Sequence, residues 1–287
     1  MTSSRWNRRQ SRAVALIAHH EPAADLLRFY ERVLESQAVV YKTAKQAGWL
    51  NELTTGPELA FNQVPVDICL PLFQKFVRDV GANSTETLSS VAINLCASKS
   101  VAKDILDAFL ALRPVDEMAA ELACSKDSVE FFARGFAQPV AEVVVGRVPT
   151  ARTLSTSGRS SGSQESNMAA CPRCGWPPQL AVLQDGEETR GERKLLCALC
   201  LTEWIFPRAT CPACWSTDTD KLIHHSTDVW PHIRVEECQT CSSYLKAIDL
   251  RENGLAVPVV DEIASVELDL WANENGLTKL QRNLLGL

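Results

Sequence analysis

The sequence contains no long hydrophobic run and no excess of positive charge, and each absence excludes a class of protein. Its longest uncharged apolar stretches, such as Ile68–Phe73 and Val143–Val145, fall far short of the roughly 20 residues that a membrane-spanning helix needs. The 287 residues include 29 Lys and Arg against 35 Asp and Glu, whereas nucleic acids and acidic membranes are bound by clustered basic residues. We therefore expect no membrane insertion and no nucleic acid, and a protein as the partner.

Signals for export and for catalysis are also missing. Arginines precede the apolar run Ala13–Ala18, but six residues are too few for the hydrophobic region of a signal peptide, and no small-residue cleavage site follows. We interpret this segment as the basic start of a helix and expect a cytoplasmic protein. No Ser-His-carboxylate set, phosphate-binding glycine loop or His-Glu-x-x-His motif is present, so the sequence predicts no catalytic residue and does not favour an enzyme.

Cysteine, by contrast, is abundant, with eleven in the chain. In a reducing cytoplasm this abundance favours metal or redox chemistry over disulfides. Cys69, Cys96 and Cys124 stand singly within apolar patterns, and we expect them to be small core residues. The other eight lie between residues 171 and 241. This distribution predicts a helical domain over 1–150 and a metal-binding domain over 171–287, joined by the Ser-, Thr- and Gly-rich residues 151–170 as a flexible linker.

The predicted helical domain shows apolar residues at three- and four-residue intervals, which is typical of amphipathic helices. Ser84 and Ser100 precede two of the segments and are candidate caps, and Pro139 predicts a kink in the last one. His19 and His20 adjoin a helix start, and we expect both at the surface. Helices are predicted over Pro22–Ala44, Leu70–Gly81, Leu88–Leu95, Val101–Leu112, Glu117–Ala123 and Ser128–Val145.

Four Cys-x-x-Cys pairs dominate the second domain. They are Cys171 with Cys174, Cys197 with Cys200, Cys211 with Cys214, and Cys238 with Cys241. Tetrahedral coordination with metal–sulfur bonds of about 2.3 Å places the sulfur atoms about 3.8 Å apart, a separation that two cysteines flanking a tight turn can present. The first and third pairs are 40 positions apart, and the second and fourth are 41 apart, so one module occurs twice.

This repeat predicts two Cys₄ metal sites, one in each unit, over about 171–208 and about 211–250. In this reading the first and second pairs share one ion, and the third and fourth pairs share another. An interleaved arrangement, in which the first and third pairs share a metal, is the alternative. Units of this size are too small to be held by an apolar core alone, so metal binding should contribute much of the folding free energy.

Each unit has room for two short strands and a turn between its cysteine pairs. Because each site already has four sulfurs, His224, His225 and His232 are expected to be solvent-facing strand residues rather than ligands. Trp204 and Tyr244 follow the second and fourth pairs closely and are expected to cover the sites. The predicted strands include Leu180–Leu183, Lys194–Leu196, Lys221–His224 and Ile233–Glu236.

These motifs together resemble the FdhE family of formate dehydrogenase accessory (formation) proteins. The resemblance rests on Cys-Pro-Arg-Cys-Gly from Cys171, on Thr-Glu-Trp ending at Trp204, and on Tyr-Leu-Lys from Tyr244. It continues into the segment 261–275, expected to be a C-terminal helix carrying Ile263, Val266 and Leu270. Ser242 and Ser243 depart from the Gly-Gly that the family tends to have, and a positive φ would strain Ser242. The end of the chain lacks the usual Asn-Pro-Phe-like finish.

The resemblance implies an α+β fold, in which an all-α domain precedes a small β-rich, double rubredoxin-like or zinc-ribbon-like metal domain with a C-terminal helix. It implies a cytoplasmic protein that binds the catalytic subunit of formate dehydrogenase, is needed for its activity, and holds one iron ion per Cys₄ site. Spacing alone does not distinguish iron from zinc.

A rubredoxin-like electron carrier and a zinc-ribbon nucleic-acid-binding module are the alternatives to that function. The eight basic and eleven acidic residues of 171–250 count against the nucleic-acid module, since such a module is expected to place basic residues there. The sequence leaves a homodimer open.

Overall fold

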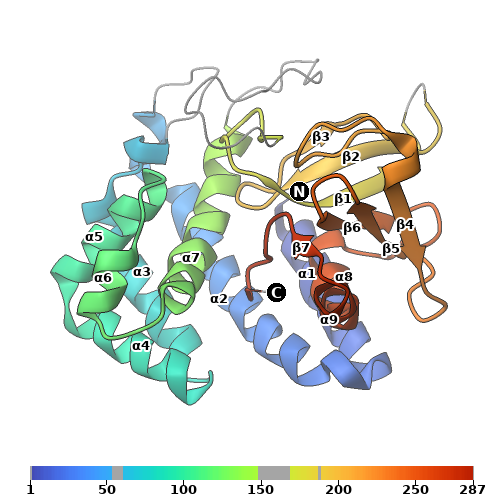
Figure 1. Ribbon diagram of the computed structural model, residues 1–287. Helices are drawn as coiled ribbons and strands as arrows, with labels where there is room; N and C mark the ends of the chain where they lie inside the picture. Colours follow the sequence, from blue (N-terminus) through green and yellow to red (C-terminus); the bar gives the residue numbers. More distant parts are fainter. Residues whose placement is uncertain (1, 54–60, 148–168, 187–188, 287) are drawn as a thin grey trace. The chain divides into compact units, whose positions relative to one another are not determined.

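The computed structural model describes residues 2–53, 61–147, 169–186 and 189–286 (Figure 1). Residues 151–168 of the predicted linker lie outside this part. Ala169 is described and buried, and its amide donates to the carbonyl of Pro212 at 2.7 Å. The chain divides into two compact units, one of Arg28–Pro149 and the other of Met1–Leu27 with Thr150–Leu285. We call them the helical unit and the metal unit.

The helical unit contains the helices that the apolar periodicity predicted, with small differences at their ends. Thr85 and Ser98 cap α4 and α5 through their side-chain oxygens, so the predicted caps Ser84 and Ser100 were wrong by one and two positions. Short 3₁₀ turns occur at Gly48–Asn51 and Phe61–Gln63. The helices are α2 (Ala24–Gln46), which begins in the metal unit, α3 (Val66–Gly81), α4 (Glu86–Ala97), α5 (Lys99–Leu110), α6 (Asp116–Glu121) and α7 (Lys126–Gly146).

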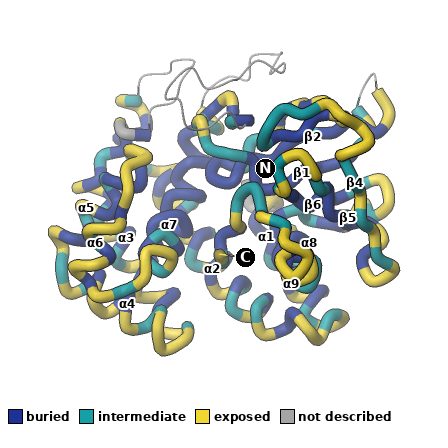
Figure 2. The backbone as a smooth tube through the Cα atoms, viewed as in Figure 1, coloured by how far each residue is buried: buried dark blue, intermediate teal, exposed yellow. Residues whose placement is uncertain are grey.

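Helix α7 is buried along most of its length, as its dark blue tube in Figure 2 shows. Pro139 lies inside this helix without ending it. Proline has no amide hydrogen, so the carbonyl of Gly135, four residues earlier, lacks its helical donor. The side chain of Gln37 replaces that donor, because its Nε2 lies 2.8 Å from the Gly135 oxygen. A buried polar side chain of α2 therefore allows α7 to continue through the proline.

The three cysteines of the helical unit differ in how deeply they are buried. Cys69 is buried, and burial raises the pKa of its thiol to about 11. Cys96 and Cys124 are half-buried, and each thiol lies 3.6 Å from a backbone carbonyl oxygen, that of Gln74 and Ala119 respectively. The structure therefore places Cys69 in the core, as expected from its apolar sequence context, whereas Cys96 and Cys124 are only partly buried.

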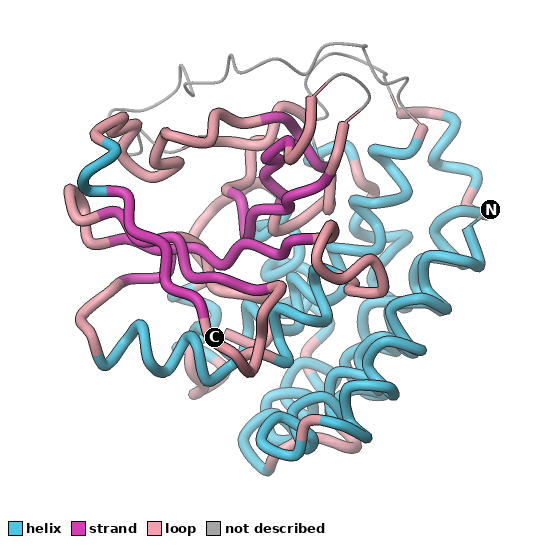
Figure 3. Tube along the Cα trace, turned by 90° about the vertical axis from the view of Figure 1, so that its right-hand side faces the viewer, coloured by secondary structure: helices cyan, strands magenta, loops and turns pink. Residues whose placement is uncertain are grey.

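The strands of the metal unit, which are magenta in Figure 3, form one seven-stranded sheet among the described residues. Their order is β3-β2-β1-β6-β5-β4, with β7 beside β6. Each repeat unit contributes three antiparallel strands, one more than predicted, and β1 pairs with β6 in parallel to join the units. The strands are β1 (Pro178–Gln184), β2 (Glu192–Cys197), β3 (Glu203–Ile205), β4 (Leu222–Ser226), β5 (Ile233–Cys238), β6 (Ser243–Asp249) and β7 (Thr278–Lys279).

Two short helices replace the single C-terminal helix predicted over 261–275. Helix α8 (Pro258–Ala264) and α9 (Val266–Glu274) meet at Ser265, whose ψ of 39° lies outside the helical range. The break lets the Ser265 carbonyl and hydroxyl accept hydrogen bonds from Lys246 on β6. Leu270, predicted as part of the apolar face, is 56% exposed. A tertiary contact therefore overrides the local helical pattern.

The N-terminal helix α1 (Thr2–His19) packs in the metal unit against α8. This differs from the predicted helical domain, which began at residue 1. The Arg12 guanidinium makes a bidentate pair with Asp261, through Nε–Oδ2 at 2.9 Å and Nη2–Oδ1 at 2.5 Å. None of the helices in the described ranges is long and apolar enough to cross a membrane.

Two histidines that were expected at the surface instead contact carboxylates of the C-terminal helices α8 and α9. His20 packs edge-on against Trp230, with ring centroids 4.5 Å apart, and its Nε2 lies 3.0 Å from Glu267 Oε1. His232 is buried, and its Nε2 lies 3.0 Å from Asp261 Oδ1. Both predictions were wrong, because the sequence does not show which carboxylates the C-terminal helices bring to these rings.

Candidate metal centres

Within the described residues, the eight cysteines of the metal unit gather into two Cys₄ clusters. In each, the four sulfur atoms lie within 4.8 Å of one another. The grouping is the one expected from the repeat, and the interleaved arrangement does not occur. The first cluster is Cys171, Cys174, Cys197 and Cys200, and the second is Cys211, Cys214, Cys238 and Cys241.

The sulfur separations fit tetrahedral coordination of one ion per cluster. In the second cluster, Cys211–Cys241 and Cys214–Cys238 are both 3.8 Å apart, the value expected for bonds of about 2.3 Å. The first cluster is slightly tighter, with separations of 3.3 to 3.6 Å among its sulfurs. No disulfide links these cysteines.

Each cysteine pair is held by the same backbone turn. The residue directly after the second cysteine has a positive φ in all four turns, at 74°, 54°, 63° and 54° along the chain. Three of the four turns also have the first cysteine's amide donating to the carbonyl five residues later, at 2.8 to 3.0 Å. Gly175 takes this conformation without strain, and Ser242 adopts the positive φ that its departure from glycine made a concern. The other two residues are Leu201 and Trp215.

The donor set of each cluster fits a soft divalent or trivalent cation. Burial raises the pKa of the Cys197 and Cys211 thiols, so ionised sulfurs gathered here need a compensating positive charge. Backbone amides point at the sulfurs, as from Arg173 to Cys171 at 3.4 Å and from Ala213 to Cys211 at 3.4 Å. Four thiolates with such donors suit zinc or iron equally.

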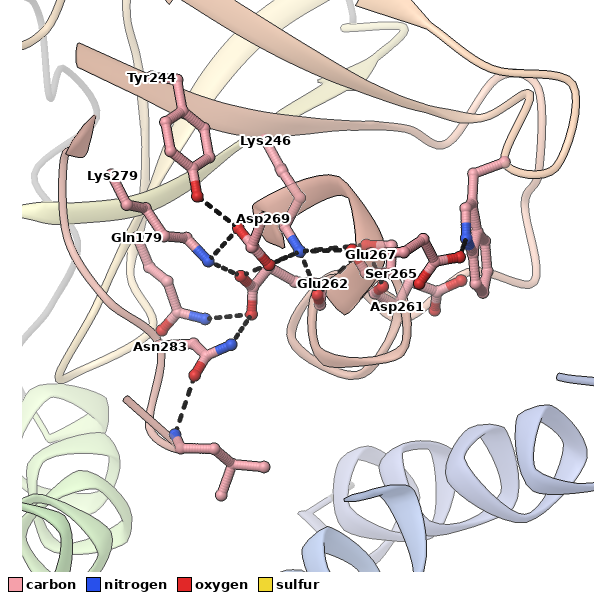
Figure 4. Close-up of polar contacts among 12 residues, drawn as sticks. Gln179, Tyr244, Lys246, Asp261, Glu262, Ser265, Glu267, Asp269, Lys279 and Asn283 are labelled. Atoms are coloured by element: carbon pink, nitrogen blue, oxygen red, sulfur yellow. Dashed lines mark hydrogen bonds and ion pairs between the residues drawn. The ribbon is translucent and has the colours of Figure 1, made fainter. Parts of the chain in front are cut away.

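A network of buried charged side chains holds the C-terminal helices α8 and α9 against the second repeat unit of the metal unit (Figure 4). Lys246, fully buried on β6, pairs with Asp269 at 2.6 Å and Glu262 at 3.4 Å. Lys279 on β7 contacts the same two carboxylates, and the Tyr244 hydroxyl donates to Asp269 at 2.9 Å. Burial by itself would raise the pKa of Glu262, but the two lysines outweigh it and lower that pKa to about 2.

This network explains two residues of the Tyr-Leu-Lys motif noted in the sequence. Tyr244 was expected to cover the metal site, but its hydroxyl is directed to α9, and its ring packs in a cluster with Val235 and Ala272. Lys246 holds the carbonyls where α8 ends and α9 begins. The motif therefore connects the strand that follows the fourth cysteine pair to the C-terminal helices. Sequence reasoning missed this role because the carboxylate partners come 16 or more residues later.

A second buried ion pair joins the two repeat units. Arg193 of β2 lies 2.7 Å from Glu236 of β5, and Arg234 contacts the other oxygen of the same carboxylate at 2.7 Å. Burial alone would raise the Glu236 pKa, but the two arginines hold it below its usual range. Arg193 also stacks over the ring of Phe206 at 5.4 Å. The two metal clusters are therefore mounted on one continuous sheet rather than on independent modules.

Comparison with known proteins matches the metal unit to two family models that meet at the boundary between the repeat units. Residues 170–208 match "FdhE, central domain", and residues 209–285 match "FdhE, C-terminal domain". Residues 170–285 are therefore similar to FdhE proteins, which confirms the resemblance noted from the cysteine motifs and the residues that follow them.

Several curated proteins named "Protein FdhE homolog" resemble the same part of the chain. The protein from Aquifex aeolicus is 43% identical over 116 residues, which are 40% of this chain and 41% of that protein. The protein from Pseudomonas aeruginosa is 33% identical over 119 residues, 40% of this chain and 38% of its own length. The alignments thus span about two fifths of these FdhE relatives.

A solved structure extends the similarity of fold beyond the FdhE domains. The crystal structure of the FdhE protein from Pseudomonas aeruginosa superposes with a TM-score of 0.70 over 98% of this chain and 94% of that chain, at 20% identity. The helices, the sheet and the two Cys₄ clusters confirm the predicted α+β fold class.

Proposed function

We propose that this protein is an accessory factor for formate dehydrogenase, which binds the enzyme's catalytic subunit in the cytoplasm and is needed for its activity without being an enzyme itself. The observation that carries the proposal is the match of residues 170–285 to the two FdhE domains. The metal unit is built as a rigid scaffold for two Cys₄ clusters, with buried ion pairs holding its parts together.

In this proposal the eight clustered cysteines hold two metal ions, one per cluster. The sulfur separations of 3.3 to 3.8 Å support tetrahedral ligation, and the family resemblance favours iron over zinc. Bound iron would supply one-electron chemistry, whereas zinc would supply only a structural crosslink. The protein's own contribution is to fix four sulfurs per site and to direct backbone amides at them.

The experiment that tests the function is formate-dependent dye reduction in cells lacking the gene, with the gene restored as control. We expect a selective loss of activity that the wild-type gene repairs. A double variant, Cys211→Ser with Cys214→Ser, should fail to repair it, while Cys69→Ser in the helical unit should succeed. Co-purification with the catalytic subunit tests the partner directly. Normal formate oxidation without the gene would refute the accessory role.

A mononuclear electron carrier is the second candidate, because Cys214 and Cys241 of the second cluster are half-buried rather than buried. Sulfur near the surface would let electrons reach a bound iron ion. This candidate requires reversible one-electron reduction of the purified, iron-loaded chain. A chain that restores formate oxidation equally well when loaded with zinc would exclude it, since zinc has no redox chemistry.

A further inference from the structure

We propose that the two clusters have different roles, the first holding its metal permanently and the second exchanging its metal with the surroundings. The inference rests on the proposed metal ligation and goes beyond it, because neither the repeat nor the family distinguishes the clusters. The 40-residue repeat permits a position-by-position comparison, in which Cys171 corresponds to Cys211 and Cys197 to Cys238.

Exposure is the first difference between the clusters. Three cysteines of the first cluster are buried, and only Cys174 is half-buried. In the second cluster, Cys214 and Cys241 are both half-buried. A chelator or competing thiol must reach a metal–sulfur bond to displace it, and the second cluster has two partly exposed cysteines where the first has one.

The turn between the last two cysteines of each cluster shows the same contrast more strongly. In the first cluster, Ala198 and Leu199 between the cysteines are 0% and 1% exposed. The corresponding residues of the second cluster, Gln239 and Thr240, are both exposed, and so is the following Ser242. One half of the second cluster therefore opens to solvent, while its counterpart is enclosed by protein.

Backbone conformation is the third difference. The first cluster has Gly175 at one of its two positive-φ positions, where the conformation carries no steric cost. The second cluster has Trp215 and Ser242 at both positions, with φ of 63° and 54°. A residue with a Cβ is sterically strained in this region, so opening the second cluster relieves strain at both turns, whereas opening the first relieves it only at Leu201. A cavity lined by Cys211 and Cys238, among others, adjoins the same cluster.

The test is the rate of metal release from the full chain loaded with two equivalents of zinc, followed with the chromogenic chelator 4-(2-pyridylazo)resorcinol. We expect two phases of one equivalent each, separated by at least about tenfold, because local opening free energies differ between enclosed and exposed segments. Cys214→Ser should remove the fast phase. The matched variant Cys174→Ser, 40 positions earlier, should remove the slow one.

Peptide mapping after brief treatment of the unmutated, zinc-loaded chain with N-ethylmaleimide gives a readout that does not depend on folding of the variants. We expect Cys214 and Cys241 to be modified before any cysteine of the first cluster. Release of both equivalents at one rate, or earlier modification of Cys171 or Cys197, would overturn the assignment while leaving the accessory function intact. A chain that binds no zinc or iron at all would overturn both the ligation and the exchange.

Discussion

Replacing Arg12 by alanine should destabilise the metal unit, although this residue lies more than 150 positions before Cys171, the first cysteine of the two clusters. Its partner Asp261 has a side chain that is 0% exposed, and the Arg12 side chain is 15% exposed. Burial would raise the pKa of Asp261, but hydrogen bonds from His232 and Arg12 outweigh it and hold that pKa below its usual range. Without Arg12 the buried carboxylate loses its guanidinium.

The magnitude follows from what remains around Asp261. Removing one partner of a fully buried pair costs about 3–5 kcal/mol. Here His232 at 3.0 Å and the Val257 amide at 2.8 Å still bind the carboxylate. We therefore expect the free energy of unfolding to fall by about 2–3 kcal/mol, at or just below the low end of that range. With a urea m-value of about 1–3 kcal/mol per M, the unfolding midpoint should fall by about 0.7–3 M.

Tryptophan fluorescence during urea unfolding is the suitable assay, since it reports mainly on the metal unit. The matched control is Arg8→Ala, an exposed arginine on the same helix, which should change the stability by no more than about 0.5 kcal/mol. Equal effects of the two substitutions would refute the assignment of α1 to the metal unit. Six of the seven tryptophans lie in that unit, namely Trp6, Trp176, Trp204, Trp215, Trp230 and Trp271.

The structure supports three further predictions. Ser242→Gly should stabilise the metal-loaded chain by about 0.5–1 kcal/mol in urea unfolding, because it relieves a positive φ; a loss of stability would contradict this. Glu262→Gln should lower the free energy of unfolding, measured in urea, by about 3 kcal/mol at pH 7. Because the folded pKa of about 2 lies below the unfolded value of 4.5, the deficit should shrink as pH falls from 4.5 toward 2, and a pH-independent deficit would exclude this account. Gly81→Ala would place its Cβ 2.2 Å from that of Ala92 and should cost about 1–3 kcal/mol in thermal unfolding followed by circular dichroism, whereas Gly146→Ala, with nothing within 4 Å, should not destabilise.

Local patterns in the sequence were sufficient for most of the helical unit. Apolar residues at helical intervals mark one face of each helix whatever it packs against, so α2 to α7 were predicted within a few residues. The caps were less predictable, because Ser84, Thr85, Ser98 and Ser100 offer adjacent hydroxyls of nearly equal propensity. Which of them accepts the amide depends on where the chain leaves the preceding helix.

By itself, the sequence predicted the resemblance of the metal domain to FdhE proteins, the eight cysteines of its two clusters, and a net charge unfavourable to nucleic acid, whereas the structure excluded the interleaved grouping of those cysteines. Those features are set by spacing and composition, which do not depend on distant contacts. Only the tertiary structure decided that α1 packs with the metal unit, that Ser265 splits the last helix, and that Lys246 and Arg193 tie the parts together. Such pairs join residues far apart in sequence, and a buried charge is stable only where the whole fold supplies its partner.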